Sequence, residues 1–240
     1  NTKVFALGNI TYNERKLSHI TSRISGRIEE VFAFLQSKVK VDEPLLSLYS
    51  PEYLIFQSEY IQAEERVKRV KQIGDKEEEI TAKAIYESAR RKLEILGVNK
   101  EELSKLENTH IPESYLTIRA PFFGTIIENN AVQGNYIEQG SNLYKLADLT
   151  TLWIIADVYE KDIAQVETGE IVEIQATAYP NKIFIGNVVG IGDVLDEKTR
   201  TFKVRIEVKN LESKLKPGMF VNVSIESKSS IEALAIPVSA

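Results

Sequence analysis

The chain has 240 residues, a formal net charge of −5 and an isoelectric point of about 5.4. This acidic balance argues against a nucleic-acid binder, and the absence of cysteine excludes disulfides, thiolate zinc sites and cysteine nucleophiles. With 43% hydrophobic and 27% charged residues, the chain suits two or three small modules better than one compact ball. No apolar run approaches the roughly 18 residues that a membrane span requires.

A first strand is expected at residues 4–11, and an internal repeat follows it. Residues 26–48 return without a gap as residues 124–146, at a constant offset of 98 (124 − 26). Each copy reads as a glycine, an alternating apolar strand, a turn and a second short strand, the pattern of a β half-unit. The offset pairs two glycines and several apolar residues: Gly26 with Gly124, Ile28 with Ile126, Ala33 with Ala131, Leu45 with Leu143 and Leu48 with Leu146.

The two copies predict one β module that has been opened by an insertion. We expect residues 22–50 and 110–148 to form two similar half-motifs around a pseudo-twofold axis, as a flattened β-barrel, with the paired glycines in equivalent structural positions. Asp42 aligns with Gly140 at the turn before the last strand of each copy. Both residue types tolerate a left-handed turn conformation, so the substitution is mild.

The inserted segment has helical periodicity. Ser50 is the expected N-cap of a helix that begins at Pro51, with Glu52 in its first turn. The apolar residues of this helix recur at steps of four and three, which predicts a heptad seam of Phe56, Tyr60, Ala63, Val67 and Val70.

A second helix is expected after a break at Gly74 and Asp75, and it ends at Gly97. Its apolar stripe is predicted to face the first helix, so that the two form an antiparallel hairpin with arms of roughly 30–35 Å. Asn99 and Glu102 indicate a capping box for a third, short helix to about Glu107. The predicted stripe of the second helix consists of Ala82, Ile85, Ala89, Leu93 and Leu96.

The rest of the chain predicts a second β-barrel, which the strand at residues 4–11 would join. Its segments are rich in β-branched residues, and a short helix is expected at residues 160–166. From Ser227 onward we expect a further module. The predicted strands span residues 152–159, 171–178, 185–191, 201–208 and 219–225.

Seven short motifs accompany the split repeat, in a fixed order. They are Tyr12-Asn13-Glu14-Arg15, Gly26-Arg27-Ile28-Glu29, Tyr49-Ser50-Pro51-Glu52-Tyr53, Ala147-Asp148-Leu149-Thr150-Thr151-Leu152-Trp153, Tyr159-Glu160-Lys161-Asp162, Thr199-Arg200-Thr201 and Leu215-Lys216-Pro217-Gly218-Met219. The two halves resemble those of biotinyl/lipoyl carrier domains, in which a hairpin between the halves presents the cofactor lysine. Here helices replace that hairpin. This arrangement resembles the HlyD-like periplasmic adaptor (membrane fusion) proteins of tripartite efflux pumps, and within them the CusB-like, heavy-metal RND branch.

The resemblance implies an elongated, multi-module α+β fold, with a helical hairpin inserted in a split lipoyl-like domain and a β-barrel after it. In chain order, the expected parts are 1–21 as strands joining the β-barrel, 22–50 as the first lipoyl-like half, 51–109 as the hairpin, 110–148 as the second half, 149–226 as the β-barrel and 227–240 as the start of a truncated membrane-proximal domain.

The function implied by the resemblance is that of a periplasmic adaptor associated with the inner membrane. It would link an RND-type transporter of the inner membrane to an outer-membrane channel, for export of heavy-metal cations, and would self-associate as a ring or funnel. The signal or anchor segment of such a protein is not present in these 240 residues. Alternatives are an adaptor of a drug-exporting RND or ABC-type pump and, in other classes, a lipoyl-type carrier or a ligand-binding β protein.

The tip of the hairpin is the candidate site for partner docking. It comprises Lys71, Gln72, Ile73, Gly74 and Asp75. Ile73 would stand at the most distal point, where the coiled coil has no core of its own. It is either an exposed anchor for a groove in a partner or a cap that closes the end of the coil.

No catalytic, cofactor or metal site is predicted. The chain has no Ser-His-Asp pattern, phosphate-binding glycine loop or HExxH motif, which argues against an enzyme. Soft metals prefer sulfur ligands, and the one methionine, Met219, is expected to pack in a core. His19 and His110 have no second histidine at ligand spacing. Lys38 and Lys40 are expected to be solvated rather than cofactor-bearing.

Overall fold

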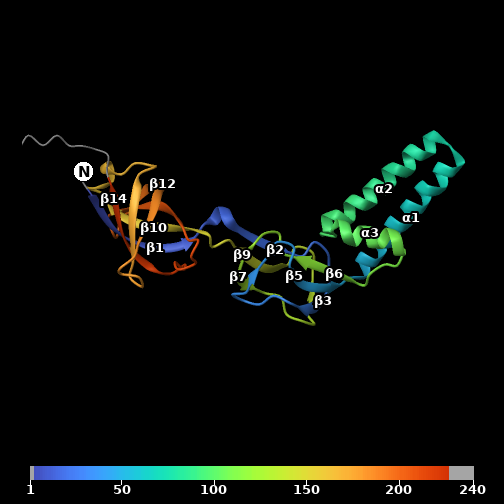
Figure 1. Cartoon of the computed structure of the whole chain (residues 1–240), viewed down its shortest axis with the longest axis horizontal. Helices are drawn as coiled ribbons and strands as arrows, with labels where there is room; N and C mark the ends of the chain where they lie inside the picture. The colour runs from blue at the N-terminus through green and yellow to red at the C-terminus, as the bar shows by residue number, and fades with distance from the viewer. Residues whose placement is uncertain (1–2, 227–240) are drawn as a thin grey trace, which may run out of the picture. The chain divides into compact units, whose positions relative to one another are not determined.

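The computed structural model describes residues 3–226, in two compact units. One unit combines Asn1–Leu17 with Asp148–Ala240, and the other is Ser18–Ala147. The second unit contains a split β-sandwich and the three helices inserted in it (Figure 1). None of the helices among residues 3–226 is both long and apolar enough to cross a membrane.

Four strands on each side of the insertion build the split sandwich, and each strand has a counterpart 98 residues later with the same length. The first half contains β2 (Leu17–Thr21), β3 (Gly26–Val31), β4 (Lys38–Val39) and β5 (Pro44–Tyr49). The second half contains β6 (Tyr115–Arg119), β7 (Gly124–Asn129), β8 (Tyr136–Ile137) and β9 (Asn142–Ala147). They form two sheets, β2-β9-β7-β4 and β6-β5-β3-β8, and each sheet takes strands from both halves.

The pairing registers repeat with the same offset. Ile28 of β3 pairs with Leu48 of β5, and a β-bulge follows before Glu30. In the second half, Ile126 pairs with Leu146 and the bulge follows at the equivalent place. The links between halves also correspond, because β3 pairs with β8 and β7 pairs with β4 at equivalent residues. The two halves therefore repeat each other strand for strand, and they form two four-stranded sheets where a flattened barrel was expected.

The insertion consists of α1 (Pro51–Ile73), α2 (Lys76–Leu96) and α3 (Lys100–Thr109). The expected caps are present: Ser50 accepts from the Tyr53 N–H, and Asn99 forms a capping box with Glu102. Helices α1 and α2 lie side by side as a hairpin, and α3 lies at the end of the hairpin that joins the strands (Figure 1).

The prediction is wrong for one residue of the apolar stripe of α2. Ile85 is 43% exposed, whereas its neighbour Tyr86 packs against the core. The apolar stripe of α2 therefore runs from Ala82 to Tyr86, a step of four residues, and not from Ala82 to Ile85, a step of three. Successive residues of a helix differ by about 100°, so only one of the two can face α1.

The other unit is a closed barrel with the strand order β1-β10-β13-β12-β11-β14. Its core is made mainly of β-branched residues from alternate positions of these strands. A 3-10 turn, η2 (Ile163–Gln165), stands where residues 160–166 were predicted to be helical. The strands are β1 (Lys3–Tyr12), β10 (Thr151–Tyr159), β11 (Ile171–Ala176), β12 (Ile183–Asp196), β13 (Thr201–Lys209) and β14 (Phe220–Glu226).

The N-terminal strands divide between the two units. Strand β1 pairs with β10 and β14 in the barrel. Strand β2, which the expected boundary at residue 21 assigned to the barrel, lies beside β9 in the split sandwich. The reason is that β2 is the counterpart of β6 and completes the first half-motif. The module expected at residues 227–240 lies outside the described residues.

Candidate docking site at the hairpin tip

The tip is built from the last residues of α1, a one-residue left-handed turn and the N-cap of α2. Gly74 has φ 83° and donates its N–H to the Val70 carbonyl, which ends α1. Asp75 accepts hydrogen bonds from the N–H groups of Glu77 and Glu78, which starts α2. Lys71, Gln72 and Ile73 are exposed on this turn. Since α1 has 23 residues, the tip stands about 34 Å along the helix axis from the first residue of α1.

Ile73 does not close the end of the coiled coil. Its side chain is 75% exposed, and an added Cβ at the adjacent Gly74 would meet no atom within 4 Å. Burial in the hairpin stops one turn earlier, at Val70 and Ala82. Of the two roles that the sequence left open for Ile73, the geometry fits the exposed anchor.

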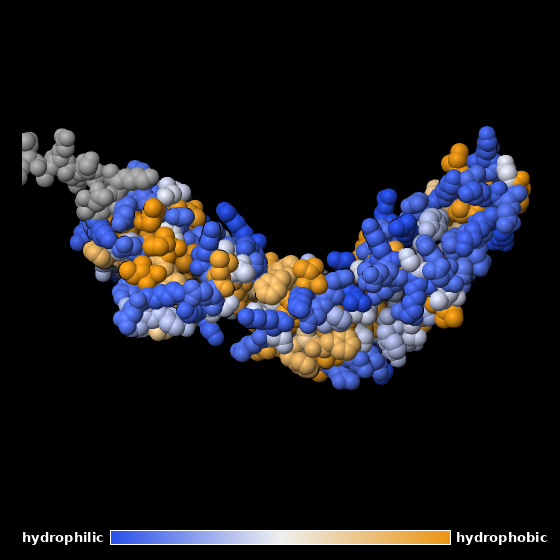
Figure 2. Space-filling model, in the orientation of Figure 1, coloured by the Kyte–Doolittle hydropathy of each residue, from blue (hydrophilic) through white to orange (hydrophobic). Residues whose placement is uncertain are grey.

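A second apolar side chain, missed in the sequence analysis, lies near the tip. Ile80, in the second turn of α2, is 71% exposed. Its position in the helix could have revealed it, because Ile80 precedes Ala82 by two residues and so lies out of phase with the seam. Figure 2 shows hydrophobic atoms at the distal end of the hairpin, within a surface that is mostly hydrophilic.

Charged side chains surround the two isoleucines. Lys71 and Lys76 flank the turn, and the first turn of α2 carries Glu77 and Glu78. The hydrogen bond from Lys83 lowers the pKa of Glu79, so this carboxylate stays ionised and paired on the surface. The tip therefore carries two exposed apolar side chains among charged residues.

The two repeat glycines are required by close packing. A Cβ on Gly26 would lie 2.3 Å from the Tyr49 carbonyl oxygen and 3.0 Å from Leu48 Cγ. A Cβ on Gly124 would lie 2.8 Å from the Ala147 carbonyl oxygen. Each glycine thus lets a strand approach its paired strand closely at the same point of its half-motif.

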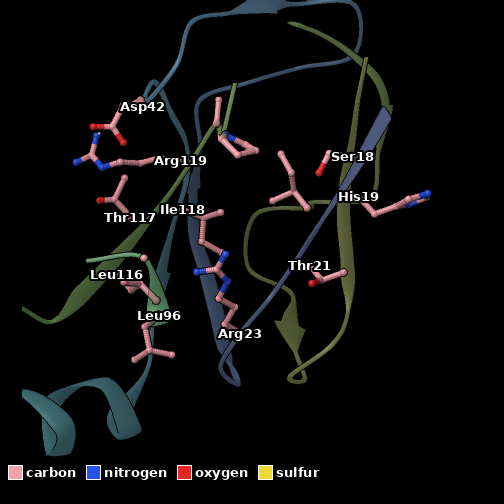
Figure 3. A pocket seen from close by; sticks show the side chains of 14 residues that line it. Ser18, His19, Thr21, Arg23, Asp42, Leu96, Leu116, Thr117, Ile118 and Arg119 are labelled. Carbon is pink, nitrogen blue, oxygen red and sulfur yellow. Dashed lines mark hydrogen bonds between the residues drawn. The ribbon is translucent and has the colours of Figure 1, made fainter. Parts of the chain in front are cut away.

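The candidate metal ligands of the sequence analysis do not form a common site. Met219 packs against the barrel core. His19 is exposed, and its ring points away from Asp42 and Arg119 (Figure 3). His110 Nε2 lies 3.2 Å from a carboxylate oxygen of Glu64, an ion pair when the imidazole is protonated. Within residues 3–226, no three His, Asp or Glu side chains are arranged to hold a metal ion.

The lysines weighed as cofactor carriers are on the surface of the first half. Lys38 lies in the short strand β4, and Lys40 follows it; both are exposed. A carrier lysine would lie between β5 and β6, where this chain has its helices. The geometry therefore places neither lysine in a carrier position.

A split β-sandwich with a helical hairpin inserted between its halves, together with a closed β-barrel, is the architecture of a membrane fusion protein. The family model for the CzcB-like barrel-sandwich hybrid domain matches residues 16–148, and the model for the CusB-like β-barrel domain matches residues 151–229. The chain belongs to the CusB/CzcB-like membrane fusion proteins.

Individual relatives agree with this family. The cobalt-zinc-cadmium resistance protein CzcB of Cupriavidus metallidurans is 29% identical over 91% of this chain and 44% of its own length. The putative membrane fusion protein SilB of Salmonella typhimurium is 28% identical over 95% of this chain and 50% of its own length. The chain thus spans about half the length of these relatives. The crystal structure of ZneB from Cupriavidus metallidurans has the same fold, with a TM-score of 0.59, 23% identity and coverage of 95% of this chain and all of that one.

Proposed function

We propose that this chain is the adaptor part of a tripartite efflux pump, which links an RND-type transporter of the inner membrane to an outer-membrane channel across the periplasm. The family membership and the relative named as a cobalt-zinc-cadmium resistance protein support a pump for heavy-metal cations. The adaptor makes the connection and carries out no catalysis. In this proposal several copies associate as a ring or funnel.

The observation that carries the docking role is the exposure of Ile73 at the end of the hairpin. An isoleucine that is 75% exposed at the last residue of α1 contributes little to the core of the hairpin itself. Transfer of such a side chain from water into an apolar groove is favourable by about 1.5–3 kcal/mol. Repetition of the contact around a ring would multiply the effect through avidity. Lys71, Gln72, Gly74 and Asp75 would form the polar rim of this contact.

The test is capture of the outer-membrane channel by the Ile73→Asp variant. We expect a steep loss of capture with an unchanged thermal melt, because the side chain contacts no core. Ile85→Asp is the matched control, since Ile85 is also exposed on the hairpin but lies three turns from the tip. Equal capture by both variants and the wild type would exclude the tip as the docking surface.

A further inference from the structure

The base of the hairpin and the split sandwich share one hydrophobic core. Tyr53 and Tyr60 of α1, Leu93 of α2 and Leu106 of α3 belong to the same buried cluster as Ile28 of the sandwich. The distal seam is not part of this cluster and contains smaller residues: Ala63, Val70 and Ala82. The hairpin therefore has a thick base, to which α3 contributes, and a slender distal part.

A polar cluster inside this base joins the three helices. Tyr60 of α1 is fully buried, and its hydroxyl lies 3.0 Å from the hydroxyl of Tyr86 of α2. Both hydroxyls donate to the same carboxylate oxygen of Glu107 of α3, the Tyr86 bond at 2.9 Å. The two rings are stacked, with centroids 5.2 Å apart. One residue from each helix thus meets at a single point.

Three further contacts tie the base to the sandwich. Arg119 of β6 forms an ion pair of 2.8 Å with Glu102 of α3. The buried amide of Gln57 exchanges two hydrogen bonds with the backbone of Glu113, in the segment between α3 and β6, at 2.8 and 2.9 Å. Arg23 donates to the Ile95 carbonyl in the last turn of α2.

The two arginines line a hollow of about 300 Å³ between the edge strands β2 and β6 and the end of α2. In Figure 3 the Arg119 side chain lies beside Asp42, and the Arg23 side chain extends toward Ile118. Arg119 also donates to the Asp42 carbonyl. Both guanidinium groups thus already have partners within the protein. The hollow therefore belongs to the contact between the hairpin and the sandwich and is not an open anion site.

We propose that α3 is a strut that holds the hairpin in one orientation on the split sandwich, and that Glu107 is the positioning residue that locks it. Without α3, the hairpin would keep its two chain connections, the Gln57 and Arg23 hydrogen bonds and part of the shared core. It would lose the Glu102–Arg119 ion pair, the Glu107 cluster and the α3 side chains of the core, which leaves more freedom of rotation about the two chain connections. The carboxylate of Glu107 reaches both tyrosine hydroxyls at one position of α3 only, so the cluster selects that position. A part-buried polar network is well suited to such selection, because a different position of α3 would take the shared carboxylate away from both hydroxyls.

The strut is tested by the distance between the hairpin and the sandwich. The chain has no cysteine, so Ala84→Cys on exposed α2 and Gln133→Cys on an exposed sandwich loop give one clean pair of spin labels. Pulsed electron paramagnetic resonance then gives the distribution of distances. We expect a single narrow distribution in the otherwise native chain, and one broadened at least roughly twofold by Glu107→Leu.

The conservative variant and a control separate positioning from general stability. Glu107→Gln keeps an oxygen that accepts from both tyrosines, so it should restore the narrow distribution. Glu101→Leu changes an exposed residue of the same helix and should leave the distribution narrow. If Glu107→Leu fails to fold, Tyr86→Phe, which removes one donor from a half-buried ring, takes its place. A narrow distribution in a folded Glu107→Leu or Tyr86→Phe variant would overturn the proposal.

Discussion

Gly26 lies so close to Tyr49 that an ideal Cβ on the glycine would stand 2.3 Å from the tyrosine carbonyl oxygen. The same relationship recurs between Gly124 and Ala147, at 2.8 Å. In both pairs the obstructing atom belongs to the backbone, which cannot rotate away as a side chain can. The close approach of the two paired strands in each half-motif therefore depends on glycine.

Substitution of these glycines by alanine should destabilise the split sandwich. We expect Gly26→Ala to cost about 2–3 kcal/mol of unfolding free energy and Gly124→Ala less, because the backbone must move further at Gly26. Urea unfolding of the two variants measures the difference. An unchanged urea midpoint for Gly26→Ala would show that the two strands can move apart to accept the methyl group with no loss of unfolding free energy.

Two turns of the first half should be improved by glycine. Gln36 and Asp42 have φ of 67° and 66°, and their counterparts 98 residues later are Gly134 and Gly140, with φ of 85° and 89°. A left-handed conformation costs a non-glycine residue roughly 1–2 kcal/mol, and glycine loses part of that gain through the entropy of the unfolded chain.

We therefore expect Gln36→Gly and Asp42→Gly each to stabilise the chain by up to about 1 kcal/mol. The converse change, Gly134→Gln, should destabilise it by a similar amount. Denaturant unfolding of the three variants measures both signs. Destabilisation by both glycine variants would mean that the replaced side chains make contacts worth more than the strain.

The carboxylate of Glu107 should make stability depend on pH in the acid range. The hydrogen bond from Tyr60, with a further one from Tyr86, lowers the pKa of Glu107 below its ordinary value. A group with a lowered pKa in the folded state stabilises the fold above its unfolded-state pKa, and this stabilisation is lost as the pH falls through the folded-state pKa.

The stability of the wild type relative to Glu107→Gln should therefore decrease as the pH falls from about 6 to about 3, since protonation removes the charge that the variant already lacks. Urea unfolding at several pH values measures this difference. A constant difference over the range would show that the ionised carboxylate is not favoured by the fold.

Ile80 should contribute to docking together with Ile73. Both side chains are more than 70% exposed near the tip. Ile80→Asp should therefore weaken channel capture, and the double variant should weaken it further, with melting temperatures unchanged within about 2 °C. Full capture by Ile80→Asp beside impaired capture by Ile73→Asp would confine the contact to the turn itself.

The corrected seam of α2 predicts opposite outcomes for two neighbours. Ile85→Ala should change the unfolding free energy by less than about 0.5 kcal/mol, because Ile85 faces solvent. Tyr86→Ala should cost about 2 kcal/mol or more, because the ring stacks on Tyr60 and packs against the core. Thermal melts of the two variants show which residue faces α1. A larger loss of stability for Ile85→Ala would mean that the apolar stripe of α2 runs through Ile85, as first predicted.

The repeat and the ends of the helices could be predicted from local sequence patterns. Local chemistry sets such features: a glycine where backbones approach, Ser50 and Asn99 where a helix needs a cap, and Gly97 where a helix stops in a left-handed conformation. The place of Ile73 at the distal end of the hairpin could also be predicted, because the turn between the two helices follows it directly.

Tertiary structure alone decided which residue faces which neighbour. Ile85 and Tyr86 both fit a heptad between Ala82 and Ala89, and the choice falls on Tyr86, whose ring stacks on Tyr60 while its hydroxyl reaches Glu107. Glu107 lies 21 residues from Tyr86 and 47 from Tyr60, so no local pattern could reveal the cluster. Periodicity specifies which positions of a helix are apolar, but the partner of a polar side chain is chosen by the packing of elements distant in the chain.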